Sequence, residues 1–566
     1  MIRLLLIFIL TSAIAITVSA SSQPVATIET ADMVVVNGKI YQKNPALAHN
    51  TTMAVLNGNI VHIGNASTIK TWIGTSTQVL NAEGLSVYPG FIDTHVHVFE
   101  GASEIGADCE LDPALTLRQQ IPLLQECAEY LNTPSQWLIG YGYQLDALLS
   151  GNTPFSPRNV LDELFPANPV IIMEESSHSM WVNSRALQLA GINAASEHPV
   201  GGRLMYETGS NTLNGILFDN AGDMVMELAW NAQQRVMQRS YNGLLAGLAA
   251  LAENGITTAG DGRLYWRRGW YQVWQRALVE EELSARVALR PWIYPELPIA
   301  KQIAKLQQMQ STPSNSLLFS NQVKLYVDGV LHFGTAKVDR AYDWSWQNNL
   351  PKGLYYIAPA ELGQWLKALN NIGYGAHIHA VGDKAISVAL DAIGQERKAN
   401  NKQLFSLTHL EMLAKKDVPK FNAFNVHADF QAGAVFFAEH SWAKDYIGRS
   451  RAKKLLPMRD AYNSGANITF SSDWTVNDLN PLIAIANSLR ERKKQGLPDF
   501  EQALDAATIN GAKALGIEHL TGSLDVGKSA DFVLLSDDIS RLNPRQIEQT
   551  DILMTVLAGK IVFEAE

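Results

Sequence analysis

The chain has 566 residues, of which 47% are hydrophobic and 18% charged, and its 45 Lys and Arg against 55 Asp and Glu give a formal net charge of -10. This length suits one large domain with appendages or several domains, and the composition is that of an ordinary globular enzyme. No basic stripe with interleaved aromatic residues is present in the sequence, which argues against nucleic acid as a partner.

Residues 1–20 have the pattern of a secretory signal peptide. Arg3 precedes an apolar run from Leu4 to Val18, and the small residues ending at Ala20 provide a cleavage site. We therefore expect cleavage near Ala20 and a periplasmic or secreted protein that meets the membrane only through this peptide. A single-pass anchor is the weaker alternative, because the run is short for a membrane span. No Cys stands directly after the expected cleavage site, so a lipid anchor is not indicated.

Both ends of the mature chain have a β pattern. Residues 33–38 and 53–63 are short apolar runs that contain Asn-Gly turns, and 522–535 and 552–563 repeat the pattern near the C-terminus. We expect residues 21–88 and 521–566 to pair into one β-sandwich beside a central domain.

The long middle segment, residues 89–520, alternates strands with helices, which favours parallel βα units. After Gly382, for example, Ile386, Ala389 and Ile393 recur at helical spacing. The strand candidates are 89–97, 256–260, 286–293, 322–328, 374–379, 404–409, 424–429 and 467–473. Eight such units predict an α/β fold of the closed (β/α)8 TIM-barrel type.

The segment from about 100 to 230 is too long for one βα unit and has its own apolar strands at 137–141 and 169–173. We expect it to be an insertion after the first strand that covers the barrel mouth and shapes the substrate pocket. It also carries the two cysteines of the chain, Cys109 and Cys127. In an exported protein they form either one disulfide or two packed thiols, and the sequence leaves both alternatives open.

The first strand of the barrel ends in a His-x-His pair. Alternation along a strand puts His95 and His97 on one face, where their imidazoles can bind one metal ion or act as hydrogen-bonded core residues. Later strands end in further ligand types: His379 on the fifth, His409 on the sixth and Asp473 on the eighth, with Lys324 within the fourth. Because active sites of barrels lie at the carboxyl ends of the strands, this set could hold two divalent metals.

Several motifs carry a resemblance to a known family. They lie at 89–97, 178–187, 323–329, 379–385, 408–411, 471–474 and 522–531, and they include Pro-Gly-Phe-Ile-Asp-Thr-His-Val-His and Ser-Ser-Asp-Trp. In this combination and order the chain resembles the amidohydrolase superfamily, and within it the YtcJ-like and N-substituted formamide deformylase-like group (amidohydrolase family 3). The resemblance covers nearly everything after the signal peptide.

The resemblance implies a distorted barrel with a composite β-sandwich, and it implies a role for each ligand. His95 and His97 would bind a more buried metal, and His379 and His409 a more exposed one. Lys324, carboxylated by carbon dioxide, would bridge the two. The metals would be two Zn ions, with Fe, Mn, Co or Ni as alternatives. Asp473 would contact the buried metal and act as the general base.

The implied activity is hydrolysis of a non-peptide carbon-nitrogen bond in a small-molecule N-acyl or N-formyl amide by metal-bound hydroxide, with Asp473 passing the proton to the departing nitrogen. A cyclic amidase, a deaminase or a lactonase could use the same site. A different class, a non-catalytic binding or regulatory barrel protein, is the remaining alternative, and the complete ligand set argues against it. Homodimers are common among such barrels.

Some assignments stay open at the level of sequence. His377 shares a strand face with His379 and could replace it as the ligand, although a supporting role is favoured. Lys324 could pair with Asp328 or another carboxylate and leave a single metal. Candidates for the substrate pocket are His178, Tyr326, Asp328 and Trp474, with His427 and Gln431 as weaker ones. We expect His49, His62, His198, His440 and His519 to be surface or structural residues.

Overall fold

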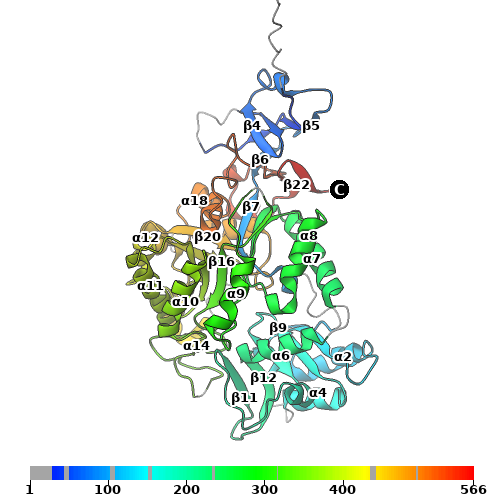
Figure 1. The fold of residues 1–566 in the computed structure, drawn as a ribbon, viewed down its shortest axis with the longest axis vertical. Coiled ribbons are helices and arrows are strands. Elements are labelled where there is room, and N and C mark those ends of the chain that lie inside the picture. Colours follow the sequence, from blue (N-terminus) through cyan, green and yellow to red (C-terminus); the bar gives the residue numbers. More distant parts are fainter. Residues whose placement is uncertain are drawn as a thin grey trace, which may run out of the picture.

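The computed structural model describes residues 29–43, 50–101, 109–150, 156–232, 236–314, 316–347, 349–433, 442–491 and 495–566. The signal peptide expected over 1–20 lies outside these residues, as do His49 and His440. Among the helices of the described ranges, none combines the length and the apolar character that crossing a membrane requires. The chain has an α/β fold in an elongated molecule, with terminal strands at one end and a separate sheet at the other (Figure 1).

Strands from both ends of the chain share a sheet in the upper part of Figure 1, below β4 and β5. Tyr88 pairs with Val533 in an antiparallel ladder that joins the two termini. The order in this sheet is β2 (Lys39–Ile40), β6 (Ser86–Pro89), β21 (Phe532–Leu535), β22 (Ile552–Leu557) and β23 (Lys560–Glu564). A second sheet has the order β4 (Asn59–Gly64), β3 (Thr52–Leu56), β1 (Met33–Val36) and β5 (Gln78–Asn81). The two sheets contribute Met33, Val87 and Phe532 to one hydrophobic core.

Two sheets of parallel strands form the centre of the molecule. One has the order β15 (Leu318–Phe319), β14 (Arg286–Ala288), β13 (Ile256–Asp261) and β7 (Phe91–Val96). The other has the order β16 (Gln322–Tyr326), β17 (Gly375–Ala380), β18 (Phe405–His409), β19 (Val426–Gln431) and β20 (Asn467–Ser471). Each of the eight strand candidates of the predicted βα units contains a strand of these two sheets, so the parallel βα pattern is confirmed.

One of these strands is shorter than its apolar pattern predicts. The sequence suggests a strand over 286–293, but β14 ends at Ala288. Pro291 has no N–H to donate to a ladder, so only isolated bridges follow, from Pro291 to Leu264 and from Trp292 to Lys324. The second of these bridges links the segment after β14 to Lys324 in β16, and so joins the two parallel sheets.

The other edges of the two sheets meet where β20 lies beside β7. The Asp473 N–H donates to the His95 carbonyl at 2.9 Å, and the Thr94 hydroxyl donates to the Phe470 carbonyl at 3.0 Å. The first and last parallel strands of the chain are therefore neighbours, and their carboxyl ends lie together.

Helices and helical turns pack around these sheets. In α11 (Asp383–Lys398) the predicted apolar positions Ile386, Ala389 and Ile393 are all buried, which confirms that helix. The others in this part of the chain are α1 (Val98–Gly101), α7 (Val236–Glu253), α8 (Trp270–Val279), α9 (Ile299–Met309), α10 (Pro359–Asn371), α12 (Val418–Ala423), α14 (Ala443–Ile447), α15 (Arg449–Ala452), α16 (Met458–Asn463), α17 (Pro481–Arg490), α18 (Phe500–Ala506), α19 (Ile509–Leu515) and α20 (Pro544–Ile547). Short 3-10 turns are η2 (Ile69–Trp72), η3 (Trp266–Arg268) and η4 (Ile539–Arg541).

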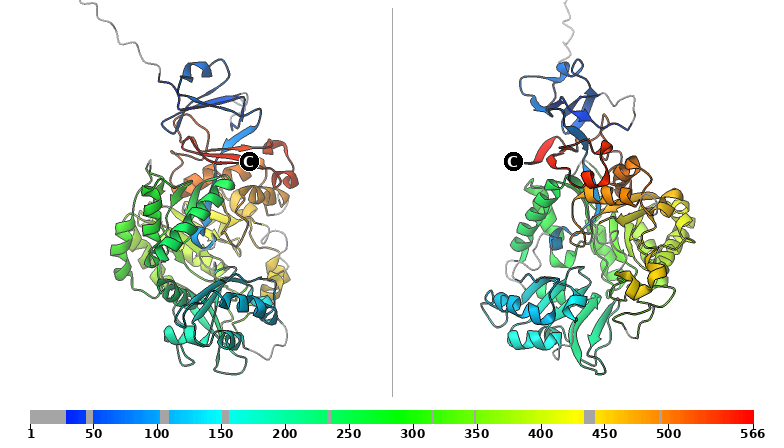
Figure 2. Two further views of the ribbon diagram at one scale, coloured as in Figure 1. Left: turned by 90° about the vertical axis from the view of Figure 1, so that its right-hand side faces the viewer. Right: turned by 180° about the vertical axis from the view of Figure 1, so that it is seen from behind.

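The segment between β7 and β13 builds a fifth sheet at the end opposite the terminal strands, as Figure 2 shows from two further sides. Its order is β11 (Gly202–Tyr206), β12 (Leu213–Asp219), β10 (Ser179–Val182), β9 (Val170–Glu174) and β8 (Leu138–Tyr143). Its helices are α2 (Leu117–Ala128), α3 (Leu145–Leu148), α4 (Pro157–Leu164), α5 (Ser184–Leu189) and α6 (Asn220–Asn231). Of the two alternatives for the cysteines, the structure has the disulfide between Cys109 and Cys127.

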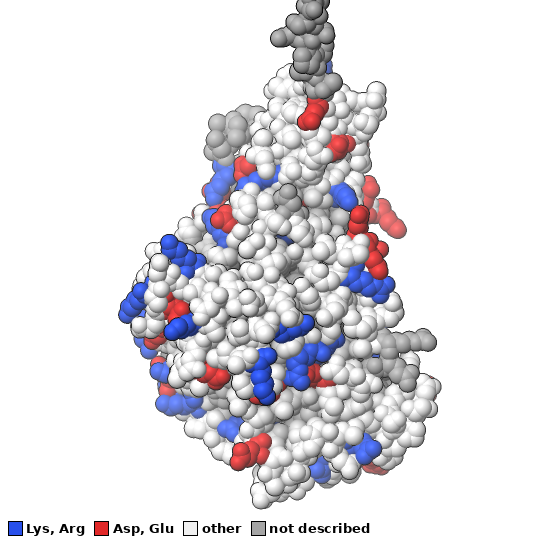
Figure 3. Space-filling model, in the orientation of Figure 1, with Lys and Arg blue, Asp and Glu red and all other residues white. Residues whose placement is uncertain are grey.

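Charged side chains of both signs are interspersed over the face of the molecule drawn in Figure 3. Several of them are paired across the surface, for example Lys420 with Asp391 at 2.5 Å. Exposed pairs of this kind contribute little to stability, typically about 0.2–1 kcal/mol.

Candidate active site

The predicted ligands come from the carboxyl ends of parallel strands. His95 lies in β7, Lys324 in β16, His379 in β17 and His409 at the end of β18, while Asp473 follows β20 by two residues. Because the strands run in the same direction, these side chains meet at one edge of the central sheets. They lie at the edge that faces the β8–β12 sheet, which is the expected position for an active site in this kind of fold.

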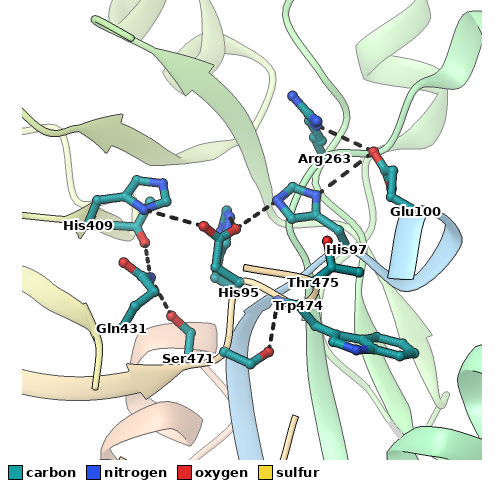
Figure 4. A network of polar contacts seen from close by, with 12 residues as sticks. His95, His97, Glu100, Arg263, His409, Gln431, Ser471, Trp474 and Thr475 are labelled. Carbon is teal, nitrogen blue, oxygen red and sulfur yellow. Dashed lines mark hydrogen bonds and ion pairs between the residues drawn. The ribbon is translucent and has the colours of Figure 1, made fainter. Parts of the chain in front are cut away.

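The carboxylate of Asp473 contacts three imidazoles, which belong to the residues labelled His95, His97 and His409 in Figure 4. Its Oδ1 is 3.1 Å from Nε2 of His95 and 2.9 Å from Nε2 of His97. Its Oδ2 is 3.7 Å from Nδ1 of His409. Ligand atoms of His95, His409 and Asp473 all lie within 4.8 Å of one another, and all three residues are buried. Imidazole nitrogens and a carboxylate oxygen at this spacing suit a divalent metal such as zinc.

Burial and hydrogen bonding have opposite effects on the pKa of Asp473. Burial would raise the pKa of Asp473, but hydrogen bonds from His95 and His97 outweigh it and hold that pKa well below its usual value. Burial, assisted by the nearby Lys324 ammonium, lowers the pKa of His95 well below its usual value. The arrangement therefore favours an ionised Asp473 carboxylate beside a neutral His95 imidazole, which is the ionisation state that metal binding requires.

The backbone around these residues has an uncommon conformation. Asp473, His409 and Leu410 have φ values of 53°, 76° and 54°, in the left-handed region that residues other than Gly rarely adopt. Buried contacts hold the turn at Asp473, because Asp93 accepts from the N–H of His95 at 3.0 Å and from the N–H of Ser472 at 3.1 Å. Strained backbone held in this way is typical of functional sites.

Lys324 is fully buried and lies against the metal-ligand candidates. Its Nζ is 3.2 Å from Nδ1 of His95 and 3.3 Å from Nε2 of the same ring. Burial lowers the pKa of Lys324 well below its usual value. The alternative in which Lys324 pairs with Asp328 does not occur, because the Asp328 carboxylate accepts backbone N–H groups from Lys337, Val381 and Gly382 at 2.7, 3.0 and 2.8 Å.

The two histidines of β17 have different surroundings. His377 has both ring nitrogens engaged, with His95 Nδ1 at 2.8 Å and the Ser406 hydroxyl at 2.7 Å. His379 has Nε2 at 3.1 Å from the Gly329 carbonyl, which can only accept, so Nε2 carries the proton. Its Nδ1 is buried and without a partner among the described residues, and thus has a free lone pair. This difference favours His379 as the ligand and His377 as the group that orients His95.

Two further buried residues touch this centre, and the sequence analysis did not single them out. Glu100 Oε1 lies 4.0 Å from Nδ1 of His97 and 3.4 Å from Nε of Arg263, as Figure 4 shows. Glu100 follows His97 by three residues and could have been found by asking which carboxylate orients the second histidine. Arg263 had no signal of its own in the sequence.

A cavity of about 310 Å³ opens above the cluster. It is lined by Gln144, Leu145, Asp146, Glu174, Glu175, Ser176, His178, Val330, His332, Phe333, His379, Val381, His409, Glu411, Trp442, Tyr446, Asp473, Thr475 and Val476. Side chains of the β8–β12 segment thus share the cavity with the candidate ligands. The Tyr141 hydroxyl donates to the Thr475 hydroxyl at 2.6 Å and ties the two parts together.

Among the four residues suggested for the pocket, His178 lines this cavity. Its Nδ1 is 2.7 Å from the buried Asp219 carboxylate, and its ring lies 5.3 Å from that of His379. Tyr326, Asp328 and Trp474 lie outside the described lining of the cavity. Tyr326 instead stacks on His379 at 4.1 Å between ring centres.

The weaker candidates on β19 serve other contacts. His427 Nδ1 accepts from the Asn467 side-chain amide at 2.8 Å. Gln431 donates to the hydroxyls of Thr408 and Ser471 at 3.0 and 2.7 Å, in a buried network beneath the site. His332 and Glu411 do line the cavity, although the sequence analysis gave neither a role. Glu411 lies within the family motif at 408–411, two residues after His409, so the sequence could have identified it as a candidate site residue.

A sequence profile of the Amidohydrolase family matches residues 78–563, which is most of the chain. The chain belongs to the amidohydrolase family. It is accordingly a hydrolase that acts on carbon-nitrogen bonds other than peptide bonds. The expected resemblance to this family is confirmed.

Three curated relatives match over nearly their whole length. Protein LONG AFTER FAR-RED 3 of Arabidopsis thaliana is 28% identical, with 94% of this chain and 92% of the relative covered. Putative amidohydrolase YtcJ of Bacillus subtilis is 25% identical, with 90% and 95% covered. N-substituted formamide deformylase of Arthrobacter pascens is 22% identical, with 94% and 98% covered.

A solved structure supports the fold of this amidohydrolase. An uncharacterized metal-dependent hydrolase from Pyrococcus horikoshii OT3 superposes with a TM-score of 0.70 at 20% identity, and the match covers 91% of this chain and 99% of that one. At this identity the similarity establishes the α/β fold, and the chemistry of this chain must be argued from its own residues.

Proposed function

We propose that this protein is an exported, metal-dependent amidohydrolase that cleaves the carbon-nitrogen bond of a small N-acyl or N-formyl amide, with Asp473 as the general base. The observation that carries the proposal is the position of the Asp473 carboxylate among His95, His97 and His409, next to a cavity of substrate size. The names of the formamide deformylase and YtcJ relatives support this choice among carbon-nitrogen bonds.

The ligands fit two divalent metals, for which Zn is the default and Fe, Mn, Co and Ni are the alternatives. His95, His97 and Asp473 would hold one ion, and His379 and His409 the other. The buried, unpartnered nitrogens of His379 (Nδ1) and His409 (Nε2) support this assignment, because each would otherwise be a desolvated acceptor without a partner. When bound, the metals would lower the pKa of a water molecule and polarise the substrate carbonyl.

Lys324 would bridge the metals as a carbamate. Its amine nitrogen would attack the carbon of carbon dioxide and lose a proton, which gives an anionic group with two oxygens. A cationic lysine beside two dications would be strongly unfavourable, whereas the carbamate supplies ligands. The burial of Lys324 against His95, with Asp328 engaged by backbone N–H groups, supports this role.

Asp473 would move the proton. Its carboxylate takes a proton from the attacking water, whose oxygen bonds to the substrate carbonyl carbon. The carbon-nitrogen bond then breaks as Asp473 gives that proton to the departing nitrogen, so the products are a carboxylic acid and an amine. The hydrogen bonds that hold Asp473 also orient it, and among the described residues its side chain is the one acidic group within contact distance of three candidate ligands.

The architecture and the location belong to the same proposal. We infer a distorted (β/α)8 barrel over 89–520, with an insertion at about 100–230, and a composite β-sandwich from 21–88 and 521–566. The bridge from Trp292 to Lys324 and the contact between β20 and β7 support closure of the barrel.

A signal peptide cleaved near Ala20 would export the protein, and the Cys109–Cys127 disulfide suits an oxidising compartment. A homodimer is the expected assembly.

A metal-reconstituted substrate screen tests the activity. Purified protein should bind close to two metal equivalents and should hydrolyse at least one amide among formamides, N-acyl amino acids and cyclic imides, with lactones as the comparison. Hydrolysis of lactones alone would replace the amidase by a lactonase. A folded, fully metal-loaded protein that hydrolyses none of these compounds would contradict the proposed function.

A further inference from the structure

The cavity above the candidate metal ligands has an acidic lining. Asp146, Glu174, Glu175 and Glu411 contribute carboxyl groups in addition to Asp473, and the described lining contains no Lys or Arg. Acidic side chains that face a confined cavity without a cationic partner favour a positively charged ligand, which would stabilise their ionised form.

Glu411 differs from Asp146 and Glu174 in the hydrogen bonding of its carboxyl group. It is only 6% exposed, and its Oε2 is buried and makes no hydrogen bond to the described residues. Asp146, in contrast, accepts from Trp346 Nε1 at 2.9 Å and from the Tyr446 hydroxyl. Glu174 accepts from the N–H of Ser176 at 2.7 Å. A buried carboxyl group without a partner is costly, and a ligand with N–H donors would satisfy it.

The local backbone explains why Glu411 faces the cavity. The consecutive left-handed residues His409 and Leu410 turn the chain sharply at the end of β18. His409 and Glu411, on either side of Leu410, both line the same cavity. The metal-ligand candidate His409 and the carboxyl group of Glu411 therefore face the same cavity beside a strained turn.

Aromatic rings form another part of the cavity wall. Phe333, Trp442 and Tyr446 line it, and the Trp442 ring lies 6.3 Å from the Tyr446 ring and 6.3 Å from the His332 ring. The faces of aromatic rings attract ammonium groups, and they also cover the apolar arm that carries such a group. A carboxylate beside aromatic walls is thus suited to an alkylammonium group.

We propose that Glu411 binds a protonated amino group of the substrate, so that the enzyme acts on amides with a cationic amine at the end of a flexible arm. This inference rests on the proposed amide hydrolysis for the position of the reacting carbonyl at Asp473. Glu411 pairs with the ammonium group through a charge-assisted hydrogen bond, and the aromatic walls enclose the arm.

Two isosteric probes test the inference. N-acetyl-1,4-diaminobutane ends in an ammonium group, and N-pentylacetamide has a methyl group in its place. Calorimetry on the metal-reconstituted Asp473→Asn variant measures binding without turnover. The cationic probe should bind more tightly by about tenfold to a hundredfold, the range for one charge-assisted hydrogen bond. Glu411→Gln should abolish this preference, whereas Glu174→Gln, a matched change at a carboxyl group that already has a partner, should preserve it.

The possible results separate the two proposals. Equal affinity for the two probes, binding of neither, or a preference that survives Glu411→Gln would overturn the role of Glu411. Loss of metal in Glu411→Gln would make it a metal ligand and would also overturn the role. If the preference is present and depends on Glu411, but wild-type protein hydrolyses no amide, the cation site stands and the proposed amide hydrolysis fails.

Discussion

Oδ1 of Asp473 lies 2.9 Å from Nε2 of His97. The two residues are far apart in the chain, because His97 follows β7, the first of the central parallel strands, and Asp473 follows β20, the last. The backbone repeats the contact, because the His97 N–H donates to the Trp474 carbonyl at 3.3 Å. The two ends of the parallel set are thus joined at the point where the ligands converge. A shift between β7 and β20 would therefore disturb the base and the ligands together.

Replacement of Asp473 by Asn should remove most activity while the metals are retained. The amide keeps the size of the side chain but cannot take a proton from water, so kcat should fall by about 10²–10⁴-fold, the usual contribution of a general base. Metal analysis and kcat on the best substrate of the screen are the measurements. Asp478→Asn, at an exposed residue of the same loop, is the control and should keep normal kcat. Normal turnover in Asp473→Asn would remove the proposed base.

Metal loading should depend on carbon dioxide through Lys324. If the carbamate bridges the metals, bicarbonate should increase the metal content and activity recovered when metal-free wild-type protein is reconstituted. In Lys324→Glu, a carboxylate already occupies part of this position, so bicarbonate should have no effect. Metal analysis after reconstitution with and without bicarbonate gives the answer. Equal recovery of wild-type protein in both conditions, with close to two metals, would contradict the carbamate.

The ligand positions could be predicted from sequence because each one ends a parallel strand. Alternation along β7 and the shared direction of β17 and β18 are enough to bring His95, His379 and His409 to one edge. The length of β14 was overestimated, because an apolar pattern does not report the N–H that Pro291 lacks. Periodicity therefore predicts at which edge of the sheets the ligands lie, but it does not predict the length of every strand.

The surroundings of the ligands could not be predicted in the same way. The cavity depends on how the β8–β12 segment packs over the strand ends, and contacts such as that of Tyr141 with Thr475 join residues far apart in the chain. Glu411 gave no periodic signal, because its direction follows from the left-handed turn at His409 and Leu410. Such turns are decided by tertiary contacts that outweigh local preference.

Acid should destabilise the protein through buried His427. Burial, with the nearby charges of Arg397 and Lys513 adding to it, lowers the pKa of His427 from 6.5 to about 4. Between these values the unfolded chain binds more protons than the folded one, so stability falls as the pH drops from 6.5 towards 4. At pH 5 the loss from this residue is roughly 2 kcal/mol.

His427→Gln should remove that part of the pH dependence. The free energy of unfolding in urea at pH 7.5 and pH 5 is the measurement, and the difference between the two conditions should become smaller than in wild-type protein. His519→Gln, at an exposed histidine, is the control and should leave the difference unchanged. An undiminished difference in His427→Gln would assign the acid sensitivity to other groups.

The Cys109–Cys127 disulfide should stabilise the β8–β12 segment. It joins residues separated by 18 positions, and it ties the start of this segment, next to the bridge between Glu110 and Tyr141, to the last turn of α2. Closing a loop of this size restricts the unfolded chain and stabilises the folded one by about 3 kcal/mol. Reductant should therefore lower the Tm of the wild-type protein. It should not change the Tm of the double variant Cys109→Ser, Cys127→Ser, which should unfold at the lower temperature in both conditions. A wild-type Tm that is equal with and without reductant, in protein shown to carry no free thiol before reduction, would show that the disulfide contributes nothing to stability.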